Sequence, residues 1–271
     1  MVELPTSVSG KSAEEVARRC AQEAGRIIMA HFGRHEQMIA KGRGNFVTEA
    51  DLAAEHAVLD LLRHEYPQHV ILSEETANHG VDLSAEGWLW VVDPLDGTHN
   101  FSQGIPYFAF NIALCRDGEP VLGLTYAPAT GEEFFARKSG GLTVNGEPAH
   151  ASSSPSLKQS VLGMDLGYDD ARAAHLIALL AELWPGMQSV RVMGSAALGL
   201  AYAACGRYDV FVHHFLYPWD IAAGILLVRE AGGLIVGRDG EPVSIRSQGV
   251  VAGSPAAVQD FLRLAQGKPW R

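Results

Sequence analysis

The sequence has few cysteines, and no two of them lie close together. Cys20, Cys115 and Cys205 are the only ones among 271 residues, so the chain offers neither a CxxC motif nor a disulfide framework. We expect these thiols to be small buried side chains in a reducing compartment. The first 15 residues contain no apolar run behind a basic segment, which a secretory signal would require. These features predict a cytoplasmic protein.

Long apolar runs and long basic runs are absent as well. No stretch approaches the ~20 apolar residues of a membrane-spanning helix, so no membrane partner is expected. Lysine and arginine total 21 against 31 aspartates and glutamates, a net charge of −10 with neutral histidine. Direct nucleic-acid binding is not expected, because no basic run could follow a phosphate backbone. Bound metal ions can still reverse the local field and let an acidic protein bind a phosphate ester.

Several common enzyme motifs are missing from the sequence. It contains no GxGxxG after a strand, no Walker-type GxxxxGK[ST], no GxSxG elbow and no HExxH. Hydrophobic residues make up 47% of the chain, enough to build a full core. A length of 271 residues suits two domains or one large one.

The first half of the chain predicts two helices followed by a sheet. Ser12 and Glu15 form a capping-box pattern before an apolar stripe that ends near Gly33, and a second helix begins at 48–51. Apolar runs at 69–72 and 88–92 predict buried strands. Strand-like segments joined by short turns from 109 to 144 predict an antiparallel meander.

The second half alternates strands and helices beyond a serine-rich stretch at 150–160. Helices are expected in four places, near 171–184, 195–205, 219–231 and from Ser254 onward. Alternation of this kind favours helices that cover a sheet. The predicted fold class is therefore α+β and α/β combined, with an N-terminal α+β domain over 1–149 and a C-terminal α/β domain over 150–271.

Acidic residues follow or close the apolar segments. Glu74 follows the first predicted strand, Asp93 and Asp96 follow the second, and Asp220 opens a helix. Buried carboxylates repel one another unless a cation neutralises them, and oxygen ligands without a His or Cys cluster suit Mg²⁺. Two such ions would clamp a transferring phosphoryl group. Each acid alone also fits an ordinary helix cap, turn or solvated loop.

The run WVVDPLDGTHNF at 90–101 resembles a signature of the inositol monophosphatase family. Residues 93–101 match the family pattern DP-(I/L)-DGT-x-NF at every fixed position. The family's second signature, WD followed by small residues and later GG, resembles 219–224 and 232–233. Other segments resemble the family in the same order, namely KGRGNFVTEAD at 41–51, ILSEE at 71–75 and Gly194-Ser195-Ala196.

The resemblance implies a layered αβαβα sandwich of the sugar-phosphatase type and a Mg²⁺-dependent phosphomonoesterase that uses two or three ions. It implies one Mg²⁺ site made by Glu74, Asp93 and the backbone carbonyl of Leu95. A second site would be made by Asp93, Asp96 and Asp220, and a third, weaker ion would sit near Glu74 through water. Water would attack phosphorus directly, without a covalent enzyme intermediate.

The resemblance also implies catalytic and substrate contacts. Thr98, supported by Glu74, would orient the attacking water, with Asp96 as a further catalytic residue. The N–H groups of Gly97 and Thr98 would hold phosphate oxygens where a helix begins. The substrate contacts implied are Asp96, Gly97, Thr98, Gly194, Ser195, Ala196, His213 and Asp220. The supporting residues implied are Lys41, Thr48 and Asp51.

Two residues depart from the family pattern. Asn45 stands where many members carry Asp, so we expect weaker binding of the outer ion. His213 stands where inositol-preferring members place a Glu that bonds ring hydroxyls, which changes the geometry and charge available there. A surface strand end is the plain alternative for His213.

The expected substrate is myo-inositol monophosphate. The alternatives are fructose 1,6-bisphosphate, histidinol phosphate and 3′-phosphoadenosine phosphates. A binding or regulatory protein on the same fold is the remaining alternative to an enzyme. A homodimer is expected from the resemblance.

Overall fold

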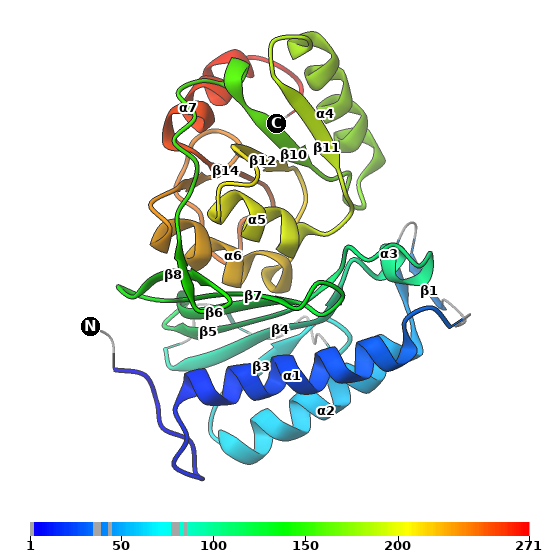
Figure 1. The fold of residues 1–271 in the computed structure, drawn as a ribbon, viewed down its shortest axis with the longest axis vertical. Coiled ribbons are helices and arrows are strands. Elements are labelled where there is room, and N and C mark those ends of the chain that lie inside the picture. Colours follow the sequence, from blue (N-terminus) through cyan, green and yellow to red (C-terminus); the bar gives the residue numbers. More distant parts are fainter. Residues whose placement is uncertain (1–2, 35–38, 43–44, 77–81, 84–85, 271) are drawn as a thin grey trace.

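The computed structural model describes residues 3–34, 39–42, 45–76, 82–83 and 86–270. Five layers follow one another along the long axis, in the order helices, sheet, helices, sheet, helices (Figure 1). This confirms the predicted αβαβα sandwich. The layers bury three apolar clusters, one beneath the first helix pair, one around the central helices and one beneath the outermost helices.

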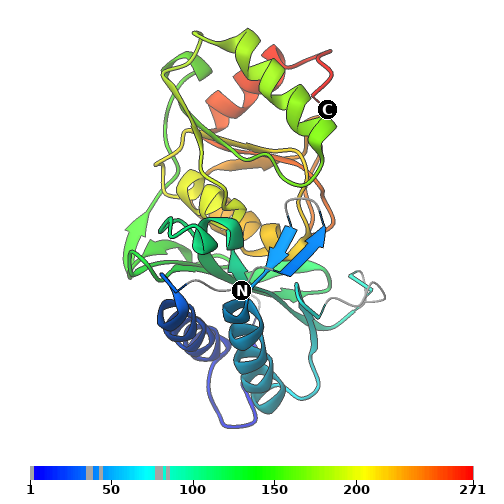
Figure 2. The same cartoon turned by 90° about the vertical axis from the view of Figure 1, so that its right-hand side faces the viewer.

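The first layer is a pair of helices, α1 (Ala13–His31) and α2 (Glu49–Glu65). The predicted capping box of α1 is confirmed, with the N–H of Glu15 donating to Ser12 Oγ at 3.2 Å and the N–H of Ser12 donating to Glu15 Oε2 at 2.7 Å. Both helices bury small and aliphatic side chains against the sheet. Figure 2 shows the two helices side by side under that sheet.

The second layer is a seven-stranded sheet in which the strands follow chain order. All neighbours are antiparallel except the first pair, which confirms the predicted meander. The strands are β3 (Val70–Ser73), β4 (Trp88–Asp96), β5 (Ala109–Arg116), β6 (Glu119–Ala127), β7 (Glu132–Arg137), β8 (Gly141–Val144) and β9 (Glu147–Ala149).

β4 is longer than the apolar run that predicted it. It continues past Val92 to Asp96, with a register shift against β5 between Asp93 and Asp96. Residues three apart on a regular strand face opposite sides, and a bulge changes which side a side chain faces. Pro94 fits such an irregular position because it has no N–H for the ladder. The bulge therefore brings Asp93 and Asp96 toward one place.

The inner and outer helices of the second half sandwich a mixed five-stranded sheet. Its strand order is β11-β10-β12-β14-β13, with β10 parallel to both of its neighbours. The strands are β10 (Val161–Met164), β11 (Ser189–Val192), β12 (Val210–His213), β13 (Leu234–Val236) and β14 (Val250–Gly253). The helices are α5 (Ala196–Ala204) and α6 (Pro218–Glu230) inside, with α4 (Asp170–Leu183) and α7 (Pro255–Leu264) outside.

Four short elements complete the described chain, namely two strands, a helix and a 3₁₀ turn. A hairpin of β1 (Ile39–Gly42) and β2 (Asn45–Val47) lies near the five-residue helix α3 (Thr98–Ser102), and a 3₁₀ turn spans Leu157–Gln159. The sequence did not predict the hairpin. None of the helices in the described residues combines the length and apolar character needed to cross a bilayer.

Candidate metal centre and adjoining pocket

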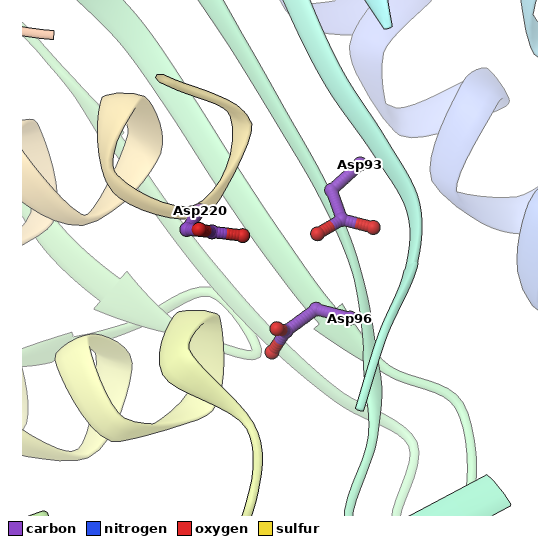
Figure 3. Close-up of side chains that lie close together, drawn as sticks. All are labelled: Asp93, Asp96 and Asp220. Atoms are coloured by element: carbon purple, nitrogen blue, oxygen red, sulfur yellow. The ribbon is translucent and has the colours of Figure 1, made fainter. Parts of the chain in front are cut away.

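Three aspartates from two elements converge between the central helices and the first sheet. Asp93 and Asp96 come from the bulged end of β4, and Asp220 comes from the first turn of α6. One carboxylate oxygen from each lies within 4.8 Å of the other two. Figure 3 shows the three carboxylates pointing toward a common space. The sequence predicted these three residues, and the structure brings them together.

Local bonds fix the orientation of each aspartate. The N–H of Leu95 donates to Asp93 Oδ1 at 3.0 Å, and the N–H of Tyr217 donates to Asp220 Oδ2 at 2.7 Å. Asp96 Oδ2 accepts from the hydroxyl of Ser195 and from the N–H of Ala197 at 3.0 Å. These donors leave other carboxylate oxygens available to a ligand.

The concentration of negative charge in the cluster favours the binding of a cation. Burial, followed by the charges of neighbouring acids, raises the pKa of Asp93 and of Asp220 well above the ordinary value. Burial also raises the pKa of Asp96 to about 7, although its bonds from Ser195 and Ala197 work in the opposite direction. A divalent ion would remove this repulsion. Clustered carboxylate oxygens without histidine or cysteine are the donors that Mg²⁺ prefers, so these residues fit that ion.

Glu74 lies outside this cluster in the described structure and pairs with a lysine. Lys41 Nζ is 2.8 Å from Glu74 Oε1 and 2.8 Å from Glu75 Oε1. The turn that carries both glutamates is held by Glu55 of α2, whose Oε1 accepts from the N–H groups of Glu75 at 3.0 Å and Thr76 at 3.2 Å. Glu55 was not predicted from the sequence. The sequence did contain a signal for it, since Glu55 comes four residues after Asp51 and the two acids therefore lie on the same face of the helix.

Thr98 bonds to Asp51 at the start of α3. Its Oγ1 lies 3.0 Å from Asp51 Oδ1 and 3.0 Å from the carbonyl of Leu95. Asp51 is held in turn by Thr48, whose N–H donates to Oδ2 at 2.9 Å in a capping box of α2. Burial raises the pKa of Asp51 to about 6. The side-chain partner of Thr98 in the described structure is thus Asp51, while Glu74 accepts from Lys41.

Gly97 permits a close approach where α3 begins. Its φ of 89° is a left-handed conformation, and a Cβ there would lie 3.1 Å from the carbonyl oxygen of Tyr107 and 3.2 Å from that of Gly194. A side chain at this position would be strained and crowded. As predicted, Gly97 and Thr98 open a helix beside the aspartates.

The loop at 193–195 is held from two sides. Asp165 Oδ1 accepts from the N–H groups of Met193 at 3.0 Å and Gly194 at 2.5 Å. Asn100 Nδ2 donates to the carbonyl of Met193 at 2.6 Å. Burial raises the pKa of Asp165 to about 6, while hydrogen bonds from the N–H groups of Gly194, Met193 and Ser195 lower it. Neither the role of Asp165 nor the contacts of Asn100 were predicted from the sequence.

A cavity of about 320 Å³ adjoins the metal centre. All of the predicted substrate contacts line it, namely Asp96, Gly97, Thr98, Gly194, Ser195, Ala196, His213 and Asp220. The other lining residues are Phe46, His99, Asp165, Leu166, Gly167, Tyr168, Val192, Phe215 and Leu216. His213 is therefore at the cavity and not at an exposed strand end. Its side chain is 4% exposed, and burial lowers its pKa to about 3. The side chain of Asn45 lies outside the described residues.

The five-layered αβαβα fold, with buried carboxylates beside a small cavity, is of the sugar-phosphatase type. Residues 11–267 match the model of the inositol monophosphatase family, and the chain belongs to this family. It is 38% identical to the Nus factor SuhB of Salmonella typhimurium, with 91% of this chain and 93% of that protein covered. It is 36% identical to the inositol monophosphatase of Dictyostelium discoideum, covering 92% and 93%.

Solved structures agree with this assignment. The extragenic suppressor protein SuhB of Bartonella henselae superposes with a TM-score of 0.87 at 32% identity, covering 94% of this chain and 98% of that one. Inositol monophosphatase II of Staphylococcus aureus, solved with inositol monophosphate bound, gives a TM-score of 0.78 at 28% identity, covering 92% of each chain. The same protein has also been solved with 2′AMP bound.

Proposed function

We propose that the protein is a Mg²⁺-dependent phosphomonoesterase that hydrolyses a small polyol or sugar phosphate, with myo-inositol monophosphate as the first candidate. The observation that carries the proposal is the convergence of Asp93, Asp96 and Asp220 beside a cavity of about 320 Å³. The phosphate ligands of the S. aureus relative support the same class of substrate.

The residues proposed to hold the ions are Asp93, Asp96 and Asp220, joined by Glu74 and the carbonyl of Leu95. Bound Mg²⁺ would supply positive charge for the phosphate and would acidify water. Glu74 pairs with Lys41 through Oε1 in the described structure. Glu74 can therefore bind an ion only if this ion pair breaks or if its other carboxylate oxygen is the ligand. We propose that two or three ions bind at this site.

The chain's own groups suit in-line attack by water. Gly97 and Thr98 stand where α3 begins, and their N–H groups are proposed to hold phosphate oxygens. Thr98 Oγ1 has one proton, which points to Asp51 or to the carbonyl of Leu95, so its lone pairs can accept a hydrogen bond from water. Asp51 is then placed to receive a proton passed on by Thr98.

The test is phosphate release from inositol 1-phosphate, fructose 1,6-bisphosphate, histidinol phosphate and 3′-phosphoadenosine 5′-phosphate, each with Mg²⁺ and with chelator. We expect Mg²⁺-dependent release that favours one ester. Absence of release from all four would contradict the proposal and favour a binding or regulatory role, in line with the name Nus factor carried by the Salmonella relative.

A homodimer, a cytoplasmic location and the absence of direct nucleic-acid binding stay proposals. Their support is the family resemblance for the dimer and the charge and composition of the sequence for the other two.

A further inference from the structure

Three basic side chains follow strands that end at the same edge of the second sheet. β12 and β13 both pair antiparallel with β14, and β10 pairs parallel with β12, so the carboxyl ends of β10, β12 and β13 lie at one edge. His214 follows β12, Arg238 follows β13, and Arg172 lies in the first turn of α4, which comes after β10. None of the three lines the cavity beside the metal centre. Ligands of α/β proteins commonly bind outside the carboxyl ends of parallel strands.

The cluster of Arg172, His214 and Arg238 has unmet hydrogen-bonding capacity. Nη1 of Arg172, Nη1 of Arg238 and both ring nitrogens of His214 are buried, and none of these atoms has a hydrogen-bond partner within the described residues. The side chain of His214 is 0% exposed. Burial lowers the pKa of His214, while Asp169 raises it, and a neutral imidazole still has one N–H to donate. Buried polar atoms without partners are rare, and a bound ion or water commonly accounts for them.

The two guanidinium groups of the cluster repel each other. Burial, followed by the charge of Arg172, lowers the pKa of Arg238. Three acids oppose this shift, namely Asp239, Glu241 and Asp169. Asp169 is engaged with Arg172, whose Nε lies 3.4 Å from Oδ2 and whose backbone N–H donates to Oδ1 at 3.1 Å. An anion held between the two guanidinium groups would remove their repulsion.

The arginines lie against the protein and are still accessible to a solute. Cζ of Arg172 lies 6.0 Å from the ring centroid of Phe215. An added Cβ at Gly249 would lie 2.8 Å from Cδ of Arg238, so the glycine allows this side chain to pack against the backbone. The side chain of Arg172 is 35% exposed, and Arg238 is partly exposed. A small anion can therefore reach both guanidinium groups from the solvent.

We propose that Arg172, His214 and Arg238 form a binding site for a phosphate-type dianion, separate from the metal centre. Each guanidinium presents its donors in a planar fork, and a tetrahedral anion can accept from two forks and an imidazole at once. A carboxylate has one charge and two oxygens, so it matches two arginines less well. The end of α4 does not make the site, because Asp169 already caps it. The proposal does not depend on the phosphatase function.

The test is calorimetric titration of the metal-free protein with inorganic phosphate at pH 7.5. Metal and chelator are both removed by dialysis, since a chelator is itself an anion, and the aspartate cluster without metal repels phosphate. We expect saturable binding of one phosphate per chain and no binding of acetate at the same ionic strength. Arg238→Gln and Arg172→Gln should each weaken phosphate binding about tenfold or more. The matched control is Arg263→Gln, an exposed arginine of α7, which should keep the affinity.

Two results would overturn the proposal. One is the absence of saturable phosphate binding, and the other is binding that survives in both arginine variants, which would place the anion elsewhere. Arg238→Gln leaves the pair of Arg172 with Asp169 in place, and His214→Leu removes the ring donor without changing the arginines. These two variants decide the question if Arg172→Gln disturbs α4, and each should bind phosphate more weakly than the wild type.

Titration with glycerol 3-phosphate separates the possible sources of the phosphate group. Tighter binding than that of inorganic phosphate would assign the site to a phosphate ester. Equal or weaker binding would assign it to the free anion. In both cases Arg238→Gln should weaken the binding, and an ester that binds this variant as tightly as the wild type would contradict the proposed site.

Discussion

Asp93 occupies the least exposed position in the aspartate cluster, with a side chain that is 1% exposed. Its carboxylate faces the charges of Glu74, Asp96 and Asp220. Asp93→Asn keeps the acceptor for the N–H of Leu95 but removes one buried charge. We therefore expect opposite effects on stability and activity, with the metal-free protein as stable as the wild type or more so, and turnover lower by about a hundredfold or more.

Thermal melts with chelator and with Mg²⁺, together with phosphate release, check this prediction. The matched control is Asp60→Asn on the exposed face of α2, which should keep both the activity and the response to Mg²⁺. A variant at position 93 that is destabilised without metal but active with it would contradict the role given to Asp93.

At the level of single residues, the sequence predicts the acids that follow apolar runs and leaves out those that hold loops. Asp93, Asp96 and Asp220 stand beside recognisable signatures, and they do converge. Asp165 carries the same local signal, since it follows the buried strand VLGM, but its role depends on the loop at 193–195. A contact between segments almost 30 residues apart along the chain cannot be predicted from a local sequence pattern.

At the level of elements, the helices and most strands could be predicted from periodicity and caps. The strand order of the second sheet could not be predicted. β10 lies between β11 and β12 and pairs in parallel with both, and parallel strands are not joined by a short turn that could be recognised in the sequence. The bulge of β4 also escaped prediction. Its apolar run ends at Val92, while the strand continues through the polar residues that the site needs.

The C-terminal end of α2 provides an element-scale prediction about pH. Glu65 is 2% exposed and accepts from Ser9 Oγ at 2.5 Å and Lys11 Nζ at 3.0 Å, which ties the N-terminal segment to the helix. Bonds from Ser9, Lys11 and Ser7 lower the pKa of Glu65 to about 2. Because the folded pKa lies below the ordinary value of 4.5, this stabilisation is complete above about pH 4.5 and is lost as the pH falls toward 2.

Glu65→Gln should therefore lower the free energy of unfolding by about 2 kcal/mol at pH 7. The difference from the wild type should shrink below pH 4.5 and vanish near pH 2. Urea titrations across this range measure it, with Glu23→Gln on the exposed face of α1 as the control. A difference that stays constant from pH 7 to pH 3 would show that the charge of Glu65 has no part in holding the segment.

At the scale of the whole molecule, the metal centre lies where distant parts of the chain meet. Asp93 and Asp96 belong to the first sheet, and Asp220 to a helix that packs on that sheet from the second half. The division into 1–149 and 150–271 stays a prediction. An ion bound to all three aspartates would contact both halves of the sequence. Its binding free energy would therefore stabilise the packing of the two halves against each other.

This arrangement predicts that Mg²⁺ stabilises the fold as a whole. An ion that binds the folded cluster and not the unfolded chain adds about 2.7 kcal/mol at a hundred times its dissociation constant. For a chain of this size that corresponds to a rise of several degrees in Tm. Calorimetry of the wild type in chelator and in saturating Mg²⁺, at matched ionic strength, measures the shift. Equal melting temperatures would show that the three carboxylates do not bind the ion. A shift that Asp93→Asn abolishes and Asp60→Asn keeps would assign the stabilisation to the cluster between the two halves.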